Sequence, residues 1–360
     1  MNDQWARVAE RIVDAVGVRA GELVQLRDLA GRIEISQEIL LAVERRGATP
    51  LFQYFPPEYL RQLLATTDPA LLTHYDQHRR VWLAITDRMI VLAGSAAAPD
   101  LPASPARDIW GQAIERLTLE EERRCIPYLL AAVPSTASSA QLGIALPELD
   151  AMIIPALGAP PDELARAAGG VLARLAQAQA LTIHSGARCS LQLSLAGRRW
   201  LSDTGTMPAA ESLPAGTQAV QNLPAGAVYT TVVETSGQGS LWFPQAGPAR
   251  DVTLHFEQGR VSAIDAADGA AELAALFDQH RGEPRRISHI GIGLNPYVER
   301  TIGWPLIDEH RHGTLLVAFG ENRYLGGQNA SSLNVDFVIP EAGLLADQQL
   351  IIRRGRLIAK

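Results

Sequence analysis

In the C-terminal part of the chain, two residues of types that commonly bind metals stand among apolar residues. Asp336 lies in "NVDFVI" (334–339), a stretch typical of a buried β-strand, and His289 stands between an apolar run and a glycine-rich turn in "RISHIGIGLNP" (286–296). A buried carboxylate is costly unless it is paired, hydrogen-bonded or bound to a cation. We therefore take Asp336 and His289 as candidate site residues. A structural, hydrogen-bonded role for Asp336 is the alternative.

The neighbouring segments hold further groups that such a site could use. "DEHRHGT" (308–314) carries His310 and His312 together with two carboxylates, and "GENRYLGGQN" (320–329) brings polar groups into a glycine-rich stretch. Imidazole is both a common metal ligand and a common acid or base. Either histidine is a candidate for completing a site, and the sequence does not decide between them.

Several well-defined enzyme motifs are absent from the sequence. There is no HExxH zinc motif, no GxSxG nucleophile motif and no GxxxxGK[ST] phosphate loop. "GIGLNP" (291–296) follows an apolar run, but Pro296 prevents it from opening a helix, and it lacks the third glycine of a dinucleotide fingerprint. The chain is therefore not expected to be a zincin, a serine hydrolase or a nucleotide-binding protein of these types.

The elements that must position these residues change in character near residue 180. Before it, apolar runs such as "RMIVLAG" and "IPYLLAAVP" alternate with helical patterns, which predicts a largely parallel sheet with helical crossovers. After it, segments of alternating polarity predict antiparallel strands, with one helix at 269–282. We predict an α/β protein with an N-terminal parallel α/β domain (1–180) and a β-rich α+β C-terminal domain (181–360) that carries the site.

Composition and charge argue against several classes of partner. The net charge is −7 and no lysine and arginine cluster is interleaved with aromatic residues, so no nucleic-acid partner is expected. No apolar run approaches the roughly 20 residues needed to cross a bilayer. The N-terminal segment has the pattern of an amphipathic helix rather than a signal peptide, and Cys125 and Cys189 are interpreted as reduced thiols. We expect a cytoplasmic protein.

Five segments of the chain resemble the aminopeptidase T / aminopeptidase S family of metallopeptidases. These are "NLPAGAVYTT" (222–231), "GRVSAI" (259–264), "IGIGLNP" (290–296), "DEHRHGTLLVAFGEN" (308–322) and "LGGQNASSLNVDFVI" (325–339). Their order and spacing fit that family, and the first half of the chain fits its N-terminal α/β domain. The resemblance implies the aminopeptidase T-like fold and a homodimer formed through the C-terminal half.

Most metal ligands of that family are missing at the matching positions. The resemblance implies two divalent metals held by glutamate, histidine and aspartate. The expected glutamates correspond to Ala227 and His289, the expected histidines to Leu316 and Asn334, and only Asp336 is retained. Alanine and leucine cannot bind a cation, and a two-metal site needs several shared donors. The resemblance therefore predicts that the two-metal peptidase mechanism is lost.

One branch of this fold has a histidine where His289 stands. "ISHIGIGLNP" is similar to the corresponding segment of the 2,5-dihydroxypyridine 5,6-dioxygenases, iron(II) enzymes that cleave a hydroxylated pyridine ring. There, two histidines and an aspartate form a facial triad, which leaves positions open for substrate and dioxygen. The implied triad here is His289, Asn334 and Asp336, with an amide replacing one imidazole. Tyr324 or His312 would then assist proton transfer.

We therefore expect an enzyme with an altered, mononuclear metal site, with iron(II) as the candidate metal, acting on a small molecule such as a hydroxylated heteroaromatic compound. The alternative is a metal-independent enzyme or small-molecule-binding protein, in which His289 and Asp336 form a hydrogen-bonded acid–base pair. A structural or interaction role for an inactive homologue is a third hypothesis, and an active metallo-aminopeptidase is the least supported. Asn334 distinguishes them: it is a ligand if a metal binds and a substrate hydrogen-bonding group if none does.

Overall fold

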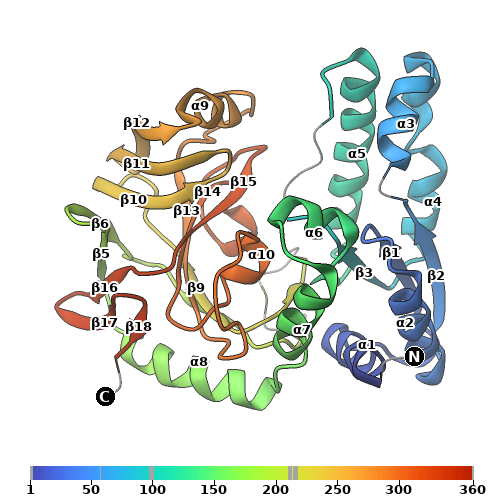
Figure 1. Cartoon of the computed structure of the whole chain (residues 1–360), viewed down its shortest axis with the longest axis horizontal. Helices are drawn as coiled ribbons and strands as arrows, with labels where there is room; N and C mark the ends of the chain where they lie inside the picture. The colour runs from blue at the N-terminus through green and yellow to red at the C-terminus, as the bar shows by residue number, and fades with distance from the viewer. Residues whose placement is uncertain (1–2, 57, 97–100, 210–212, 214–217, 359–360) are drawn as a thin grey trace. The chain divides into compact units, whose positions relative to one another are not determined.

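The structure is a computed structural model that describes residues 3–56, 58–96, 101–209, 213 and 218–358. It divides into two compact units (Figure 1). The first unit comprises Met1–Gly158 and Gly205–Pro224, and the second comprises Ala159–Thr204 and Ala225–Lys360.

The first unit is built on a parallel sheet with the strand order β2-β1-β3-β4-β8 among the described residues. Its elements are α1 (Asp3–Val16), β1 (Leu23–Asp28), α2 (Ile33–Arg45), β2 (Thr49–Tyr54), α3 (Tyr59–Thr66), η1 (Pro69–His74), α4 (Gln77–Ile85), β3 (Arg88–Ala93), α5 (Pro105–Arg123), β4 (Tyr128–Ala132), α6 (Thr136–Leu142), α7 (Leu146–Leu157) and β8 (Val220–Leu223). The parallel α/β arrangement expected for the first half is confirmed.

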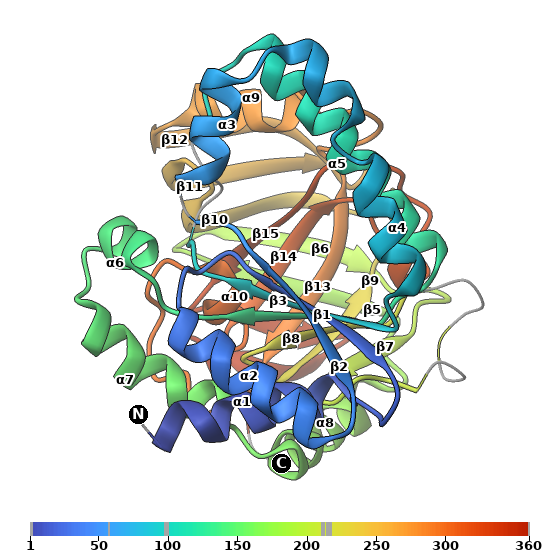
Figure 2. The same cartoon turned by 90° about the vertical axis from the view of Figure 1, so that its right-hand side faces the viewer.

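Helices pack on both faces of this sheet because its central strands are apolar on both sides. Met89 and Val91 of β3 contact Leu83 of α4 and Leu117 of α5. Ile90, between them on the strand, points to the opposite face. There α1 contacts β3, β4 and β8, and it lies beside α2 (Figure 2). The apolar face predicted for α1 is buried as expected.

The second unit contains two antiparallel sheets among the described residues, with the orders β12-β11-β10-β6-β5-β16-β17-β18 and β15-β14-β13-β9-β7. Its elements are α8 (Pro161–Leu175), β5 (Ala180–Ser185), β6 (Cys189–Ser194), β7 (Trp200–Asp203), β9 (Ala227–Thr231), β10 (Gln238–Ala246), β11 (Ala249–Glu257), β12 (Arg260–Asp268), α9 (Ala270–Asp278), β13 (Ile287–Gly293), α10 (Pro305–Asp308), β14 (Leu315–Gly320), η3 (Arg323–Leu325), β15 (Asn334–Ile339), β16 (Gly343–Ala346), β17 (Gln349–Arg353) and β18 (Arg356–Leu357). The β-rich second half is confirmed.

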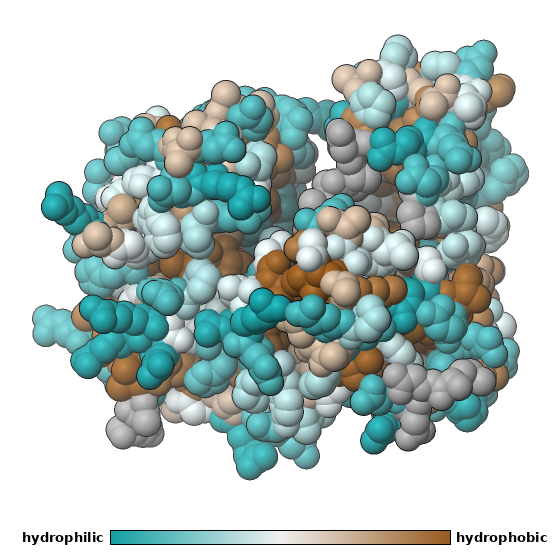
Figure 3. All heavy atoms as spheres, viewed as in Figure 1, coloured by the Kyte–Doolittle hydropathy of each residue, from teal (hydrophilic) through white to brown (hydrophobic). Residues whose placement is uncertain are grey.

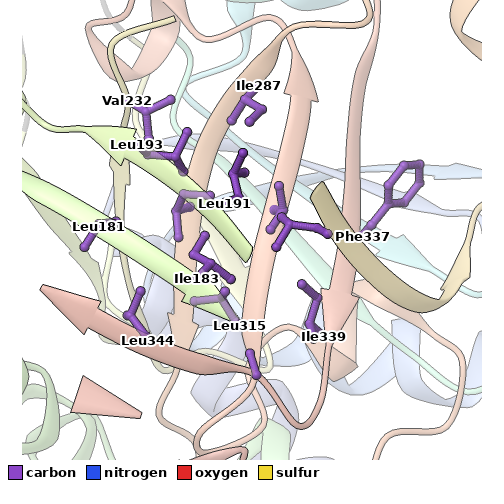
Figure 4. Packing of buried hydrophobic residues seen from close by; sticks show 14 of the residues in the cluster. Leu181, Ile183, Leu191, Leu193, Val232, Ile287, Leu315, Phe337, Ile339 and Leu344 are labelled. Atoms are coloured by element: carbon purple, nitrogen blue, oxygen red, sulfur yellow. The ribbon is translucent and has the colours of Figure 1, made fainter. Parts of the chain in front are cut away.

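The core of the second unit lies between these two sheets (Figure 4). Leu191 and Ile183 of one sheet and Leu315 and Phe337 of the other belong to the same buried cluster. Phe337 also packs edge-on against Phe243, with ring centroids 5.9 Å apart. Each large apolar side chain that is fully buried stabilises the fold by about 1.5 to 3 kcal/mol. This packing fixes the sheet that carries the candidate site.

The compact units do not divide at residue 180, where the change of sequence pattern placed the boundary. Helix α8 belongs to the second unit, because it packs on β7 and β9 and because Arg174 donates hydrogen bonds to the carbonyl oxygens of Leu350 and Ile358. Strand β8 belongs to the first unit, because it extends the parallel sheet beside β4. Local periodicity does not report which of two sheets a later strand joins.

None of the described helices is by itself long and apolar enough to cross a membrane. Helices α6 and α7 reach the required length and composition only together, and they are bent by 102° at their junction. In the space-filling view, hydrophilic side chains cover most of the visible surface, and hydrophobic ones form smaller patches among them (Figure 3).

Candidate functional site

The candidate site lies on the face of the β15-β14-β13-β9-β7 sheet that points away from the core. Successive residues of a strand point to opposite faces of a sheet. Ile290 of β13 and Phe337 of β15 are core residues, so their neighbours His289 and Asp336 lie on the other face. Two residues that are 47 positions apart in the sequence are thereby brought together from two strands that do not pair with each other.

A β-bulge in β13 aims His289 at Asp336. Ile287 pairs with Phe319 and Ile290 pairs with Val317, so Ser288 and His289 together oppose the single residue Ala318 of β14. Ala318 in turn pairs with Asp336 of β15. The small side chain of Ala318 leaves room for the imidazole and the carboxylate to approach each other above the middle strand.

His289 is buried and neutral at physiological pH. Burial lowers the pKa of its imidazole to about 4. Its Nδ1 atom lies 2.9 Å from the hydroxyl oxygen of Ser288, and its Nε2 atom lies 3.9 Å from Oδ1 of Asp336. The second distance is too long for a hydrogen bond. One ring nitrogen is thus satisfied, whereas the other faces a carboxylate without bonding to it.

Asp336 has one oxygen that lacks a partner. Oδ1 is shielded from solvent and accepts no hydrogen bond within the described part of the chain, although 32% of the side-chain surface as a whole is exposed. Burial raises the pKa of this carboxyl to about 6, and the nearby His310 opposes that rise. A buried acceptor without a donor is unfavourable by about 1 to 3 kcal/mol. The pair is therefore arranged for a cation or a proton that neither residue supplies.

A second histidine–carboxylate pair in the same unit is fully hydrogen-bonded. His310 Nε2 lies 3.2 Å from Oδ2 of Asp203, and His310 Nδ1 lies 3.1 Å from the carbonyl oxygen of Leu306. Burial alone would lower the pKa of His310, but Glu309 and Asp203 raise it above its ordinary value. Because both ring nitrogens face acceptors, this histidine is a charged, structural group with no lone pair for a metal.

Glycine at position 293 explains why the 309–311 segment lies over the sheet. A side chain there would lie 2.2 Å from the carbonyl oxygen of Arg311 and 2.5 Å from that of Glu309. Glu309 is consequently buried near Asp203 and Asp336, and burial raises its pKa to about 8. Asp203 was not identified from the sequence, because it ends an ordinary alternating strand and gives no local signal.

Tyr324 and Asn334 border the pair and contact each other. The side-chain nitrogen of Asn334 donates a hydrogen bond of 3.2 Å to the Tyr324 hydroxyl. Asn334 is two residues before Asp336 on β15, so both point to the same face. Burial and the charge of Asp336 raise the pKa of the Tyr324 hydroxyl, which therefore keeps its proton at neutral pH.

Tyr229 is a further neighbour that the sequence did not single out. Its ring meets that of His289 edge-on, with centroids 6.4 Å apart. On β9 it pairs with Gly291, beside His289 on β13. By contrast, His312 is exposed, and among the described residues its side chain forms no hydrogen bond or ion pair with His289 or Asp336. A role for His312 in proton transfer stays a prediction.

The positions of the missing peptidase ligands lie on the same face as His289. Ala227 precedes the core residue Val228 on β9, and Leu316 lies between the core residues Leu315 and Val317 on β14. A side chain on Gly291 would meet Leu316 at 3.1 Å, so Leu316 covers part of the face where the family has a histidine. Among the described residues, no three His, Cys, Asp or Glu side chains are grouped so that they could hold one metal ion.

Comparisons with known proteins agree with the resemblance seen in the motifs. A family model described as 2,5-dihydroxypyridine 5,6-dioxygenase matches residues 154–359. Two solved structures share the fold over nearly the whole chain. AmpT from Thermus thermophilus has a TM-score of 0.73 and 18% identity, with 99% of each chain covered. The 2,5-dihydroxypyridine dioxygenase of Pseudomonas putida KT2440 has a TM-score of 0.64 and 18% identity, with 100% of this chain and 98% of that chain covered. A search of curated protein sequences found no match. The expected aminopeptidase T-like fold is confirmed.

Proposed function

The chain belongs to the 2,5-dihydroxypyridine 5,6-dioxygenase family, and from this premise we propose that it is a ring-cleaving dioxygenase with a mononuclear iron(II) site held by His289 and Asp336. Its substrate would be a small hydroxylated nitrogen heteroaromatic compound. Two observations support this assignment: the family match, and the approach of His289 and Asp336 without a hydrogen bond between them.

The observation that carries the proposal is the unbonded approach of His289 and Asp336. A neutral imidazole nitrogen and a carboxylate oxygen that has no hydrogen-bond partner among the described residues face each other at 3.9 Å, too far apart for a hydrogen bond. A buried carboxylate oxygen without a donor is unfavourable, and a divalent cation bound by both groups would remove the penalty. Imidazole and carboxylate are also the ligand types of non-haem iron(II) oxygenases.

The third ligand position is where this chain departs from a His–His–Asp triad. Asn334 stands there, and because its amide nitrogen donates to Tyr324, only its amide oxygen is free to act as a ligand. The described residues thus offer a cation two strong donors and one weak donor, and no third His, Cys, Asp or Glu side chain is grouped with them. Such a site would rely on the substrate for further donors.

When bound, iron(II) would supply the redox chemistry with dioxygen and the binding of a deprotonated substrate hydroxyl. The chain's own residues have separate tasks. Tyr324 keeps its phenolic proton and is placed to donate it near Asp336. Tyr229 forms an aromatic wall beside His289, and Leu316 fills the space of a lost ligand with an apolar group.

A metal-independent function is the second candidate, and the absence of a three-ligand group within the described residues favours it. In that case His289 and Asp336 would act as an acid and a base, with the Asp336 carboxyl titrating at about 6. The two candidates predict opposite results for metal binding, so one experiment separates them.

The test is metal binding to the full-length chain, first treated with a chelator and then titrated anaerobically with iron(II), zinc or manganese in a calorimeter. We expect one metal per chain, lost in His289→Ala and in Asp336→Ala. The matched control is His255→Ala, because His255 and Asp265 form an exposed pair at 2.8 Å in the same unit. Absence of stoichiometric binding in the unmodified chain would overturn the metal site.

Activity is then tested with the iron-loaded chain and a panel of mono- and dihydroxylated pyridines, by following dioxygen consumption and loss of the aromatic absorbance. We expect turnover of at least one dihydroxylated pyridine and none in His289→Ala. If the chain binds one metal but consumes no dioxygen with any compound of the panel, the dioxygenase activity is contradicted and only the metal site is supported. The homodimer implied by the family resemblance stays a prediction, which sedimentation equilibrium of the same samples checks.

A further inference from the structure

Ser288 shares the β-bulge of β13 with His289. In a regular strand, Ser288 and His289 would point to opposite faces of the sheet. The bulge turns both toward the face on which Ala318 and Asp336 lie, and bulges commonly redirect a side chain in this way next to functional sites. As a result, the Ser288 hydroxyl lies 2.9 Å from Nδ1 of the neighbouring imidazole.

The direction of this hydrogen bond follows from the second partner of Ser288. A serine hydroxyl has one proton to donate. The Ser288 hydroxyl donates to the carbonyl oxygen of Glu321 at 2.8 Å, and a carbonyl oxygen can only accept. The hydroxyl oxygen must then accept from His289, so the proton of the neutral imidazole lies on Nδ1. The lone pair is left on Nε2, the atom that faces Asp336.

A buried polar network holds this arrangement in place. Asn322 donates one hydrogen bond of 3.1 Å to the carbonyl oxygen of Ser288 and another of 3.0 Å to Glu234. Glu234 forms an ion pair with Arg198 and accepts a further bond from the main chain of Gln328 at 2.7 Å. The segment that carries the Glu321 carbonyl oxygen is thereby tied to β13 at Ser288.

We propose that Ser288 is a positioning residue that fixes His289 in the tautomer protonated at Nδ1 and so presents the Nε2 lone pair to Asp336. The tautomer follows from the hydrogen bonds alone. Only the purpose of that tautomer, which is to make Nε2 a metal ligand, rests on the proposed function. Metal-binding histidines are commonly oriented by a hydrogen bond to the other ring nitrogen. The metal-independent alternative needs the opposite tautomer, with a proton on Nε2 for exchange with Asp336.

The tautomer is measured directly in the full-length chain, labelled with nitrogen-15 and kept free of metal with a chelator at about pH 7.5. Two-bond proton–nitrogen spectra distinguish a protonated from an unprotonated ring nitrogen, and loss of signals in His289→Gln assigns the residue. We expect Nδ1 of His289 to be protonated and Nε2 to be unprotonated. A proton on Nε2 in the unmodified chain would overturn the inference.

Two variants separate positioning from general packing. In Ser288→Ala, we expect a substantial population of the tautomer protonated at Nε2, because the acceptor for Nδ1 is gone. Ser288→Thr keeps a hydroxyl and should keep the original tautomer. The His310 signals serve as an internal control, since its partners Asp203 and Leu306 are untouched. Unchanged His289 signals in Ser288→Ala would contradict the proposal, provided that the His310 signals show a folded chain.

The metal titration gives an independent readout. Metal affinity typically falls by about 10- to 100-fold when a metal-binding histidine loses the hydrogen-bond partner of its other ring nitrogen. We expect this decrease for zinc with Ser288→Ala and little change with Ser288→Thr. If the unmodified chain binds no metal but Ser288→Ala still shifts the tautomer, the role of Ser288 is supported and the proposed metal function fails. If the chain binds metal and the tautomer does not depend on Ser288, the inference fails and the metal site stands.

Discussion

Two histidine–aspartate pairs of the second unit, each with a buried histidine, differ in how completely their atoms are bonded. His310 and Asp203 form a hydrogen bond of 3.2 Å, and the other nitrogen of His310 is also bonded. His289 and Asp336 approach only to 3.9 Å, and Oδ1 of Asp336 has no hydrogen-bond partner among the described residues. Neighbouring acceptors raise the pKa of His310, whereas burial lowers that of His289 to about 4.

A histidine beside a carboxylate is therefore not by itself evidence of a binding site. The charged, bonded pair of His310 and Asp203 stabilises the fold and offers no lone pair. The unbonded pair of His289 and Asp336 destabilises the fold slightly and offers two donor atoms. Binding sites often retain such unfavourable arrangements, since selection for function keeps them.

The largest expected effect concerns the bonded pair. Asp203→Ala should lower the free energy of unfolding by about 3 to 5 kcal/mol, because it leaves the charged His310 buried without its partner. Urea denaturation followed by circular dichroism measures this change. The control is Asp265→Ala at the exposed pair with His255, which should change stability by about 1 kcal/mol or less. Equal effects of the two variants would show that the His310 pair is not structural.

The next effect concerns the unbonded pair and its third neighbour. Asn334→His should increase metal affinity by at least about tenfold, or about 1.4 kcal/mol, because imidazole is a stronger donor than an amide oxygen. The side chain at this position points to the same face as Asp336. Calorimetric titration with iron(II) or zinc measures the gain, and Asn334→Ala is the control that should show none. Unchanged affinity in Asn334→His would mean that position 334 does not face the metal.

The two members of the unbonded pair should give opposite pH dependences of stability in the metal-free chain. The pKa of His289 is about 4 in the folded state, below its ordinary value of 6.5, so its contribution to stability increases as the pH rises between these values. The pKa of Asp336 is about 6, above its ordinary value of 3.8, so its contribution decreases over a similar range.

Single variants should therefore reveal one contribution at a time. Relative to the unmodified chain, Asp336→Asn should become more stable as the pH rises from about 4 to 6, and His289→Gln should become less stable as it rises from about 4 to 6.5. Each slope is at most that of one proton, about 1.4 kcal/mol per pH unit. Urea denaturation across this pH range measures both. Slopes of the same sign in the two variants would rule out the opposite shifts.

The smallest effect is a stabilisation. At pH 7.5 without metal, Asp336→Asn should raise the free energy of unfolding by about 1 kcal/mol, because an amide N–H can donate where two acceptors now face each other. The matched variant Asp203→Asn should instead destabilise the chain, since it removes the charge opposite His310. Thermal denaturation of both variants provides the comparison. A destabilised Asp336→Asn would indicate that Asp336 has a structural partner.

The sequence was sufficient to predict the fold class, and it singled out His289 and Asp336, whose roles stay predictions. Strands of a parallel sheet are buried on both faces and form continuous apolar runs, whereas antiparallel strands with one exposed face alternate in polarity. The sequence pattern therefore distinguishes the two kinds of strand. Asp336 stood out since a carboxylate is unusual in an apolar strand, and His289 stood out through a family resemblance that the family match confirms. The boundary near residue 180 did not coincide with the compact units, because strand partners are not a local property.

Only the tertiary structure decided which groups meet and in what bonded state. Asp203 reaches His310 across 107 positions of sequence, and Ser288 reaches the His289 imidazole through a bulge that no residue pattern announced. Distances of 3.2 Å and 3.9 Å separate a structural pair from a candidate site, although both consist of a histidine and an aspartate. Residue types determine which chemistry is available, whereas hydrogen bonding depends on geometry set by packing among distant strands.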